Sequence, residues 1–166
     1  MQIAKLGVIG AGMMGAEIAL VFAMAGKSVM LNDTAQERLD EALKKLSAVL
    51  DTGISRKFWT EEDKTVTLAN IIPTTNLQDF SDRQMVIEAV FEDAEVKGQV
   101  FKKIDKILDP NCIVASNTSS ISITVLSANV SEARQKNFVG LHFFSPVHRM
   151  KLVEVINGMD SSAEAL

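Results

Sequence analysis

Short hydrophobic runs alternate along the chain with longer segments in which apolar residues recur every three or four positions. The runs predict buried strands, and the longer segments predict amphipathic helices. This alternation is typical of the Rossmann-type α/β class, in which a mostly parallel sheet carries helices on both faces. We expect strands over residues 3–9, 28–31, 71–73, 84–90, 112–115, 137–144 and 150–156, the last two forming a hairpin or an adjacent pair.

The helices are expected over residues 14–25, 35–50, 60–70, 95–108 and 121–128, with a loop or one helical turn over 76–82. Gly26 is placed to end the first helix in a left-handed conformation. Thr60 and Asp63 have the spacing of a capping box, with Asp in place of Glu. In the helix over 95–108, Val96 and Val100 are expected to face the core.

The length of 166 residues suits one domain, and a composition of 47% hydrophobic and 23% charged residues is ordinary for a soluble protein. A net charge of −4 argues against general nucleic-acid binding, which calls for a basic face. No apolar run is long enough to span a membrane and no secretion signal is present, so we expect a cytoplasmic protein, or an organelle-matrix protein in a eukaryote. The single Cys112 excludes an internal disulfide and a cysteine metal cluster, and we expect a buried thiol.

A glycine-rich turn, LGVIGAGMMGAEIA, follows the first expected strand directly. Its glycines at 10, 12 and 15 fit the pattern G-x-G-x-x-G. Gly10 permits a tight turn, Gly12 lets a pyrophosphate approach the backbone, and Gly15 lets the helix pack closely against the strand. The helix N-terminus then offers unpaired N–H groups to the pyrophosphate. The motif alone would also fit a plain strand-to-helix turn, so its context decides.

That context includes an acid at the end of the second strand. Asp33 stands roughly 20 residues after the glycines, where a carboxylate accepts hydrogen bonds from the ribose diol of a dinucleotide. The carboxylate repels a 2′-phosphate, and no arginine follows immediately. The sequence therefore predicts a site for NAD rather than NADP.

Polar residues at the ends of the later strands are candidates for chemistry, because ligands of open α/β sheets bind at the carboxyl ends of strands. His142 is the strongest acid–base candidate, and Glu154 in the next strand can support it if the two lie side by side. Histidine suits this role because its unperturbed pKa of about 6.5 lies near neutrality. The alternative is a structural histidine. Residues 116–120 are either a substrate clamp or a capping loop, and His148 is expected to be exposed in a loop.

Four motifs in order make the pattern specific: GAGMMG (10–15), EAVFEDAEVK (88–97), ASNTSS (115–120) and GLHFFSPVHRMKLVEVI (140–156). Together they resemble the NAD-binding domain of the L-3-hydroxyacyl-CoA dehydrogenase family. The resemblance covers essentially the whole chain and is closest to the dehydrogenase part of multifunctional fatty-acid β-oxidation enzymes.

The resemblance implies roles for individual residues. His142 matches the catalytic histidine, Glu154 the acid paired with it, and Ser119 a serine that binds substrate beside the nicotinamide. The positions matching contacts to NAD are Gly10, Ala11, Gly12, Met13, Met14, Gly15, Asp33, Val90, Phe91, Glu92, Lys97, Ser119 and Ser145. Arg56 and Lys57 fall near the place where the family meets the phosphates of CoA, although this basic group also suits a solvated face. No metal is implied.

The implied reaction is oxidation of L-3-hydroxyacyl-CoA to 3-ketoacyl-CoA with NAD, in fatty-acid β-oxidation. Residues 1–166 are expected to be the NAD-binding domain, without the family's C-terminal helical domain, and Ser162 is placed to begin a further helix. The expected partners are that domain and a homodimer mate, or the hydratase and thiolase parts of a multifunctional enzyme. Alone, this piece is expected to bind NAD(H) with little or no turnover. The alternatives are another NAD-dependent hydroxy-acid or polyol dehydrogenase and a non-catalytic NAD-sensing module.

Overall fold

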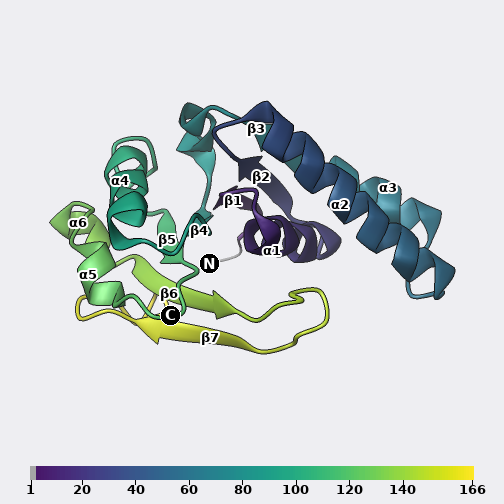
Figure 1. Ribbon diagram of the computed structural model, residues 1–166. Coiled ribbons are helices and arrows are strands. Elements are labelled where there is room, and N and C mark those ends of the chain that lie inside the picture. Colours follow the sequence, from purple (N-terminus) through teal and green to yellow (C-terminus); the bar gives the residue numbers. More distant parts are fainter. Residues whose placement is uncertain (1–2) are drawn as a thin grey trace.

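The architecture is a seven-stranded sheet of order β3-β2-β1-β4-β5-β6-β7, seen in a computed structural model that describes residues 3–166 (Figure 1). The strands are β1 (Lys5–Ile9), β2 (Ser28–Asn32), β3 (Ile71–Thr74), β4 (Met85–Glu88), β5 (Ile113–Ser116), β6 (Phe138–Phe143) and β7 (Val153–Asn157). All neighbouring strands run parallel except β7, which is antiparallel to β6. The predicted Rossmann-type class is confirmed.

Helices cover both faces of the sheet. They are α1 (Met13–Met24), α2 (Gln36–Ser55), α3 (Glu61–Ala69), the 3₁₀ helix η1 (Leu77–Asp82), α4 (Ala94–Ile104), α5 (Ile123–Ser127) and α6 (Glu132–Gln135). Side chains of successive strand residues point to opposite faces, so Ile87 packs with residues of α1 and α2 while Val86 packs with residues of α4 and α5. On the second face the rings of Phe101 and Phe138 meet edge to face at 4.8 Å.

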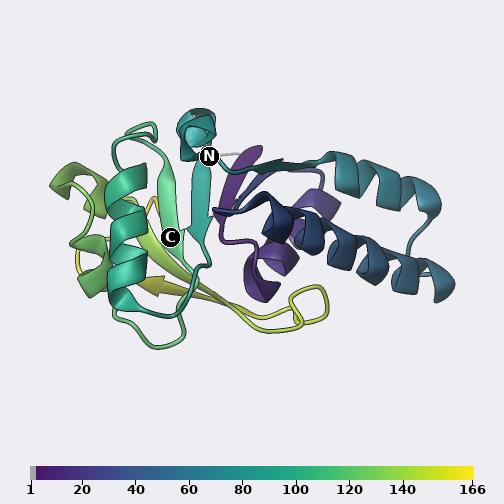
Figure 2. The same cartoon turned by 45° about the horizontal axis from the view of Figure 1, so that its top comes forward.

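Helices α2 and α3 form a pair that reaches out past the strands (Figure 2). Helix α2 runs to Ser55, beyond the predicted end at residue 50. It ends where Lys57 takes a left-handed conformation (φ 61°) and the Phe58 N–H donates to the Gly53 carbonyl at 2.9 Å. The predicted capping box of Thr60 and Asp63 is present at the start of α3.

Helix α4 ends at Ile104 rather than at the predicted residue 108. The segment after this end contacts Arg134, which lies on the short helix α6 that the sequence did not predict. Its buried guanidinium bonds to the Asp105 carboxylate at 2.6 Å and to the carbonyls of Leu108 (3.0 Å) and Asp109 (2.9 Å). The Leu108 N–H still donates to the Ile104 carbonyl at 3.0 Å, so the chain makes one more turn after α4, and Arg134 satisfies carbonyl groups of that turn and of the residue that follows it.

Strands β6 and β7 are the predicted adjacent pair, and His142 and Glu154 are register partners in it. The loop between them returns to α1, where the Val147 N–H donates to the Glu17 carboxylate. β7 begins at Val153, three residues later than predicted. After β7, the expected helix start at Ser162 is a single turn closed by the Ala165 N–H on the Ser162 carbonyl.

The structure also tests the expectations for Cys112 and for membrane-spanning segments. Cys112 is buried as predicted, and burial raises the pKa of its thiol to about 12. The sulfur is therefore neutral at physiological pH and acts as a small apolar side chain. Within residues 3–166, none of the helices is both long and apolar enough to cross a membrane.

Candidate active site

The three glycines of the turn have different surroundings. Gly10 has a φ of +100°, a conformation that favours glycine. A Cβ on Gly15 would lie 1.8 Å from the Gly10 carbonyl oxygen, so only glycine allows this approach of α1 to β1. A Cβ on Gly12 would meet no atom within 4 Å. The backbone of Gly12 therefore faces open space, which a phosphate would need in order to approach it.

A cleft of about 720 Å³ opens at this turn and runs along the carboxyl ends of the strands. The predicted cofactor residues that line it are Gly10, Gly12, Met13, Met14, Asp33, Val90, Phe91, Glu92 and Ser119. Ala11 lines an adjoining cavity that shares Asp33. Gly15, Lys97 and Ser145 are not among the described residues of the cleft wall; Ser145 is exposed in the loop after β6.

Asp33 lies directly after β2, in the wall of the cleft. It is buried, and its carboxylate accepts from the Ala11 N–H at 2.9 Å and from the Thr34 N–H at 2.8 Å. Arg38, on the first turns of α2, lies 3.7 Å from the same carboxylate. No arginine directly follows Asp33 in the sequence, but the fold places Arg38 of α2 beside its carboxylate. The acid nevertheless occupies the predicted position.

Helix α4 contributes a wall that the sequence analysis missed. Val96 was expected in the core, but this is wrong: it is 42% exposed and lines the cleft with Gln99, Val100 and Lys103. Spacing along a helix identifies an apolar face but does not say whether that face meets the core or a ligand cleft.

At the far end of the cleft three side chains form a continuous chain. His142 Nδ1 lies 2.9 Å from Glu154 Oε2, and His142 Nε2 lies 3.1 Å from Ser119 Oγ. The histidine side chain is 19% exposed, so a ligand can reach its ring. If Glu154 accepts the proton on Nδ1, Nε2 is left with a lone pair beside the Ser119 hydroxyl. This arrangement can take a proton from a bound alcohol.

Glu92 holds the Ser119 loop in place. One carboxylate oxygen, Oε1, accepts from the Thr118 hydroxyl and from the backbone N–H groups of Ser119 (3.0 Å) and Ser120 (3.3 Å). Burial would raise the pKa of Glu92, but these hydrogen bonds and the nearby Lys97 outweigh it and hold the pKa below its ordinary value. Glu92 is therefore ionised at neutral pH.

Behind the cleft, Lys97 and Glu88 form a fully buried ion pair with Nζ 2.7 Å from Oε1. Glu88 Oε2 also accepts from the Ser116 hydroxyl at 2.6 Å, and Oε1 accepts from the Val90 N–H at 2.7 Å. Burial raises the pKa of Glu88, while Lys97 opposes that rise. Lys97, which the resemblance matched to a cofactor contact, has no exposed side-chain surface in this structure.

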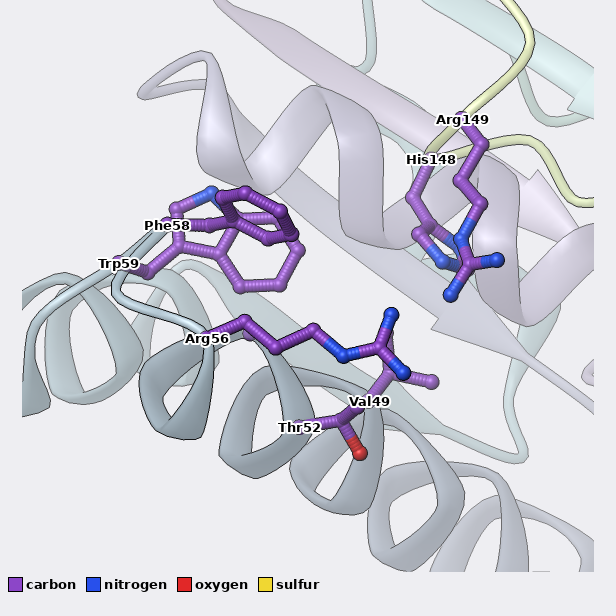
Figure 3. A pocket seen from close by; sticks show the side chains of 8 residues that line it. Val49, Thr52, Arg56, Phe58, Trp59, His148 and Arg149 are labelled. Atoms are coloured by element: carbon purple, nitrogen blue, oxygen red, sulfur yellow. The ribbon is translucent and has the colours of Figure 1, made fainter.

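A second cavity, of about 450 Å³, lies between the end of α2 and the β6–β7 loop (Figure 3). Arg56, the residue after α2, reaches into it, Arg149 faces Arg56 from the loop, and the rings of Phe58 and Trp59 lie on the Arg56 side. Lys57, predicted together with Arg56, is not among its described lining residues. His148 also lines this cavity with a side chain only 12% exposed, so the expectation of an exposed histidine is wrong.

Comparison with known proteins identifies the family. The profile described as 3-hydroxyacyl-CoA dehydrogenase, NAD binding domain, matches residues 5–166. The chain is 46% identical over 165 residues to the fatty acid oxidation complex subunit alpha of Psychrobacter sp. (strain PRwf-1), covering 99% of this chain and 23% of that protein. It is 45% identical over 166 residues to the 3-hydroxybutyryl-CoA dehydrogenase of Bradyrhizobium diazoefficiens, covering 98% of this chain and 56% of that protein.

A solved structure agrees with these relatives. (S)-3-hydroxybutyryl-CoA dehydrogenase PaaH1 from Ralstonia eutropha superposes with a TM-score of 0.95 at 40% identity, covering 99% of this chain and 57% of that one. The chain thus spans between about a quarter and just over half of the length of these relatives. With the profile matching nearly every residue, this chain belongs to the family of 3-hydroxyacyl-CoA dehydrogenase NAD-binding domains.

Proposed function

We propose that this domain binds NAD(H) and supplies the acid–base residues for oxidation of L-3-hydroxyacyl-CoA to 3-ketoacyl-CoA. The observation that carries the proposal is the Ser119–His142–Glu154 chain at the end of the cleft, with spacings of 3.1 and 2.9 Å. A module that only bound NAD would need neither a histidine paired with a carboxylate nor a serine hydroxyl beside the Nε2 atom of that histidine. This argues against a non-catalytic NAD-sensing role.

Each of the three hydrogen-bonded residues has one role in the proposed reaction. His142 Nε2 accepts the proton of the 3-hydroxyl group, Glu154 stabilises the imidazolium that forms, and Ser119 orients the hydroxyl by hydrogen bonding. NAD, when bound, supplies the hydride acceptor. Its fit rests on the bare Gly12 backbone and on Asp33 within the cleft.

The second cavity suits the nucleotide end of an acyl-CoA. Arg56 and Arg149 are cations that pair with phosphate oxygens, and Trp59 and Phe58 offer aromatic faces for an adenine. A free hydroxy acid has no group for such a cavity. This favours a CoA thioester over a hydroxy acid or polyol, and fatty-acid β-oxidation is the setting we propose.

We predict that Arg56→Gln raises the KM for acyl-CoA by about tenfold, equivalent to ~1.4 kcal/mol, with little change in kcat. The reason is that the guanidinium contacts a part of the substrate remote from the reacting carbon. Lys57→Gln is the matched comparison, because Lys57 is exposed and outside the described cavity lining. Steady-state kinetics of both variants decides: an equal rise in KM for the two would contradict an assignment to Arg56 alone.

We further propose that the active protein includes the family's C-terminal helical domain, and a homodimer mate or hydratase and thiolase parts. Support comes from the relatives, of which this chain covers 23% and 56%. Without the second half of a cleft, the 166-residue chain is expected to bind NAD(H) with little turnover. Positioning of reactants supplies about 7–11 kcal/mol of a barrier, which one wall alone does not provide.

The test of the substrate class compares 3-hydroxybutyryl-CoA with free 3-hydroxybutyrate in NADH formation by the intact protein. We expect activity on the thioester and almost none on the free acid. Activity on the acid but not on the thioester would instead support another hydroxy-acid dehydrogenase, and NADH binding without activity on either would support the sensing module.

A further inference from the structure

The buried ion pair of Lys97 and Glu88 has no role in the function proposed above. Both side chains are completely buried, with 0% exposure on each side. Removing two charges from water costs more free energy than their attraction returns in many proteins, so such a pair is a poor stabiliser compared with packed apolar residues. Its place directly behind the cleft calls for another explanation.

Lys97 has a second partner that reaches the site. Its Nζ lies 3.3 Å from Glu92 Oε2 and 3.5 Å from the Val90 carbonyl oxygen. Glu92 has its other oxygen, Oε1, on the backbone N–H groups of Ser119 and Ser120. The ammonium and the serine loop therefore hold opposite oxygens of one carboxylate.

Glu88 fixes the ammonium in turn. Glu88 is the register partner of Ser116 across β4 and β5, and it bonds to the Ser116 hydroxyl as well as to Lys97. Glu88 thus ties Lys97 to the ends of two central strands of the sheet. The anchor is preorganised, because none of its groups is free to turn toward water.

We infer that Lys97 and Glu88 are positioning residues that hold Glu92, and through it the loop 118–120, so that Ser119 Oγ stays against His142 Nε2. The linkage runs from Lys97 to Glu92 at 3.3 Å, from Glu92 to the Ser119 N–H at 3.0 Å, and from Ser119 Oγ to His142 at 3.1 Å. Lys97 acts on the reaction through these residues, while the cofactor meets the surface in front of it.

The hold of Glu92 on the loop 118–120 is expected to depend on pH. The ionised form of Glu92 accepts the loop hydrogen bonds, so the hold on the loop is present above the pKa of this carboxyl in the unfolded chain and is lost as the pH falls through its lower folded pKa. Removing the ammonium removes one cause of that lowering. The loop should then be released at a higher pH than in the native protein.

The test uses the double variant Glu88→Gln/Lys97→Met, since Lys97→Met alone leaves a buried carboxylate without its cation and is expected to unfold more readily. The amide signals of Ser119 and Ser120 are followed by NMR as the pH is lowered. We expect their acid transition to move to higher pH in the variant. Glu92→Gln, at a side chain that is 40% exposed, should abolish the transition and so assigns it.

Kinetics of the intact protein add a second readout, which rests on the proposed function. We expect kcat of the double variant to fall by about tenfold to 100-fold, the scale of a displacement of reacting groups by about 1 Å. Arg134→Met is the matched control, because it removes another buried cation paired near the opposite end of α4. It should lower thermal stability without moving the amide transition.

The outcomes are distinct. An unmoved amide transition in the folded double variant, or an equal movement in Arg134→Met, overturns the inference, and so does a double variant with native kcat. A native protein that turns over no acyl-CoA would defeat the proposed function, while the amide titration would still test the hold of Lys97 on Glu92.

Discussion

His142→Gln is expected to lower the kcat of the intact protein in the proposed reaction by about 10²–10⁴-fold, the usual contribution of a positioned general base. Glutamine keeps a polar side chain of similar reach beside Ser119 but accepts no proton at neutral pH. The Kd for NADH should stay nearly unchanged, because His142 is not among the described residues that line the cleft at the glycine turn. Stopped-flow or steady-state turnover with acetoacetyl-CoA, together with a fluorescence titration of NADH, measures both quantities.

Glu154→Gln provides a graded comparison for this prediction. The base remains, but the Nδ1 side of the ring loses its carboxylate at 2.9 Å. We therefore expect a loss of kcat smaller than that of His142→Gln. Native turnover in His142→Gln would exclude this residue as the base, and an unchanged rate in Glu154→Gln would exclude carboxylate support of the imidazolium.

Gly12→Ala and Gly15→Ala are the same chemical change three residues apart, and opposite results are expected. A methyl group on Gly12 meets no protein atom within 4 Å, so the fold is unaffected. In the proposed NAD site the methyl would occupy the place of the pyrophosphate, and losing one hydrogen bond to a charged group costs about 1.5–3 kcal/mol. The Kd for NADH should therefore rise by about ten- to 100-fold.

In Gly15→Ala the methyl group falls 1.8 Å from the Gly10 carbonyl oxygen, which lies on the backbone and has little room to move. Overpacking of this kind destabilises by about 1–3 kcal/mol, so the thermal midpoint of unfolding should drop. Thermal denaturation and NADH titration of both variants give the comparison. If the Gly12→Ala variant binds NADH normally, this result would exclude binding of the pyrophosphate at this turn.

Local patterns predicted most of the fold because each depends on neighbours in sequence. The turn glycines, the left-handed Gly26 and the Thr60 capping box are all fixed within a few residues of chain. The side-by-side arrangement of His142 and Glu154 required only that two adjacent strands pair in register. Burial of Cys112 followed from the apolar run that it begins.

The features that escaped prediction depend on residues far apart in sequence. Val96 lines the same cleft as the glycine turn, which helical spacing does not reveal. The turn after α4 is bound by Arg134 from a helix nearly thirty residues later. The cavity of Arg56 needs Arg149 from the β6–β7 loop, and no pattern in the sequence pairs these two residues.

We propose that this domain binds NADH and completes a hydroxyacyl-CoA dehydrogenase when joined to the rest of the protein. The most direct measurement is acetoacetyl-CoA-dependent oxidation of NADH by the 166-residue chain and by a chain that continues past Leu166, with NADH binding titrated in both. We expect both chains to bind NADH and only the longer chain to oxidise it at an enzymatic rate. Absence of NADH binding in both chains, or binding without any acetoacetyl-CoA-dependent oxidation by the longer chain, would contradict it.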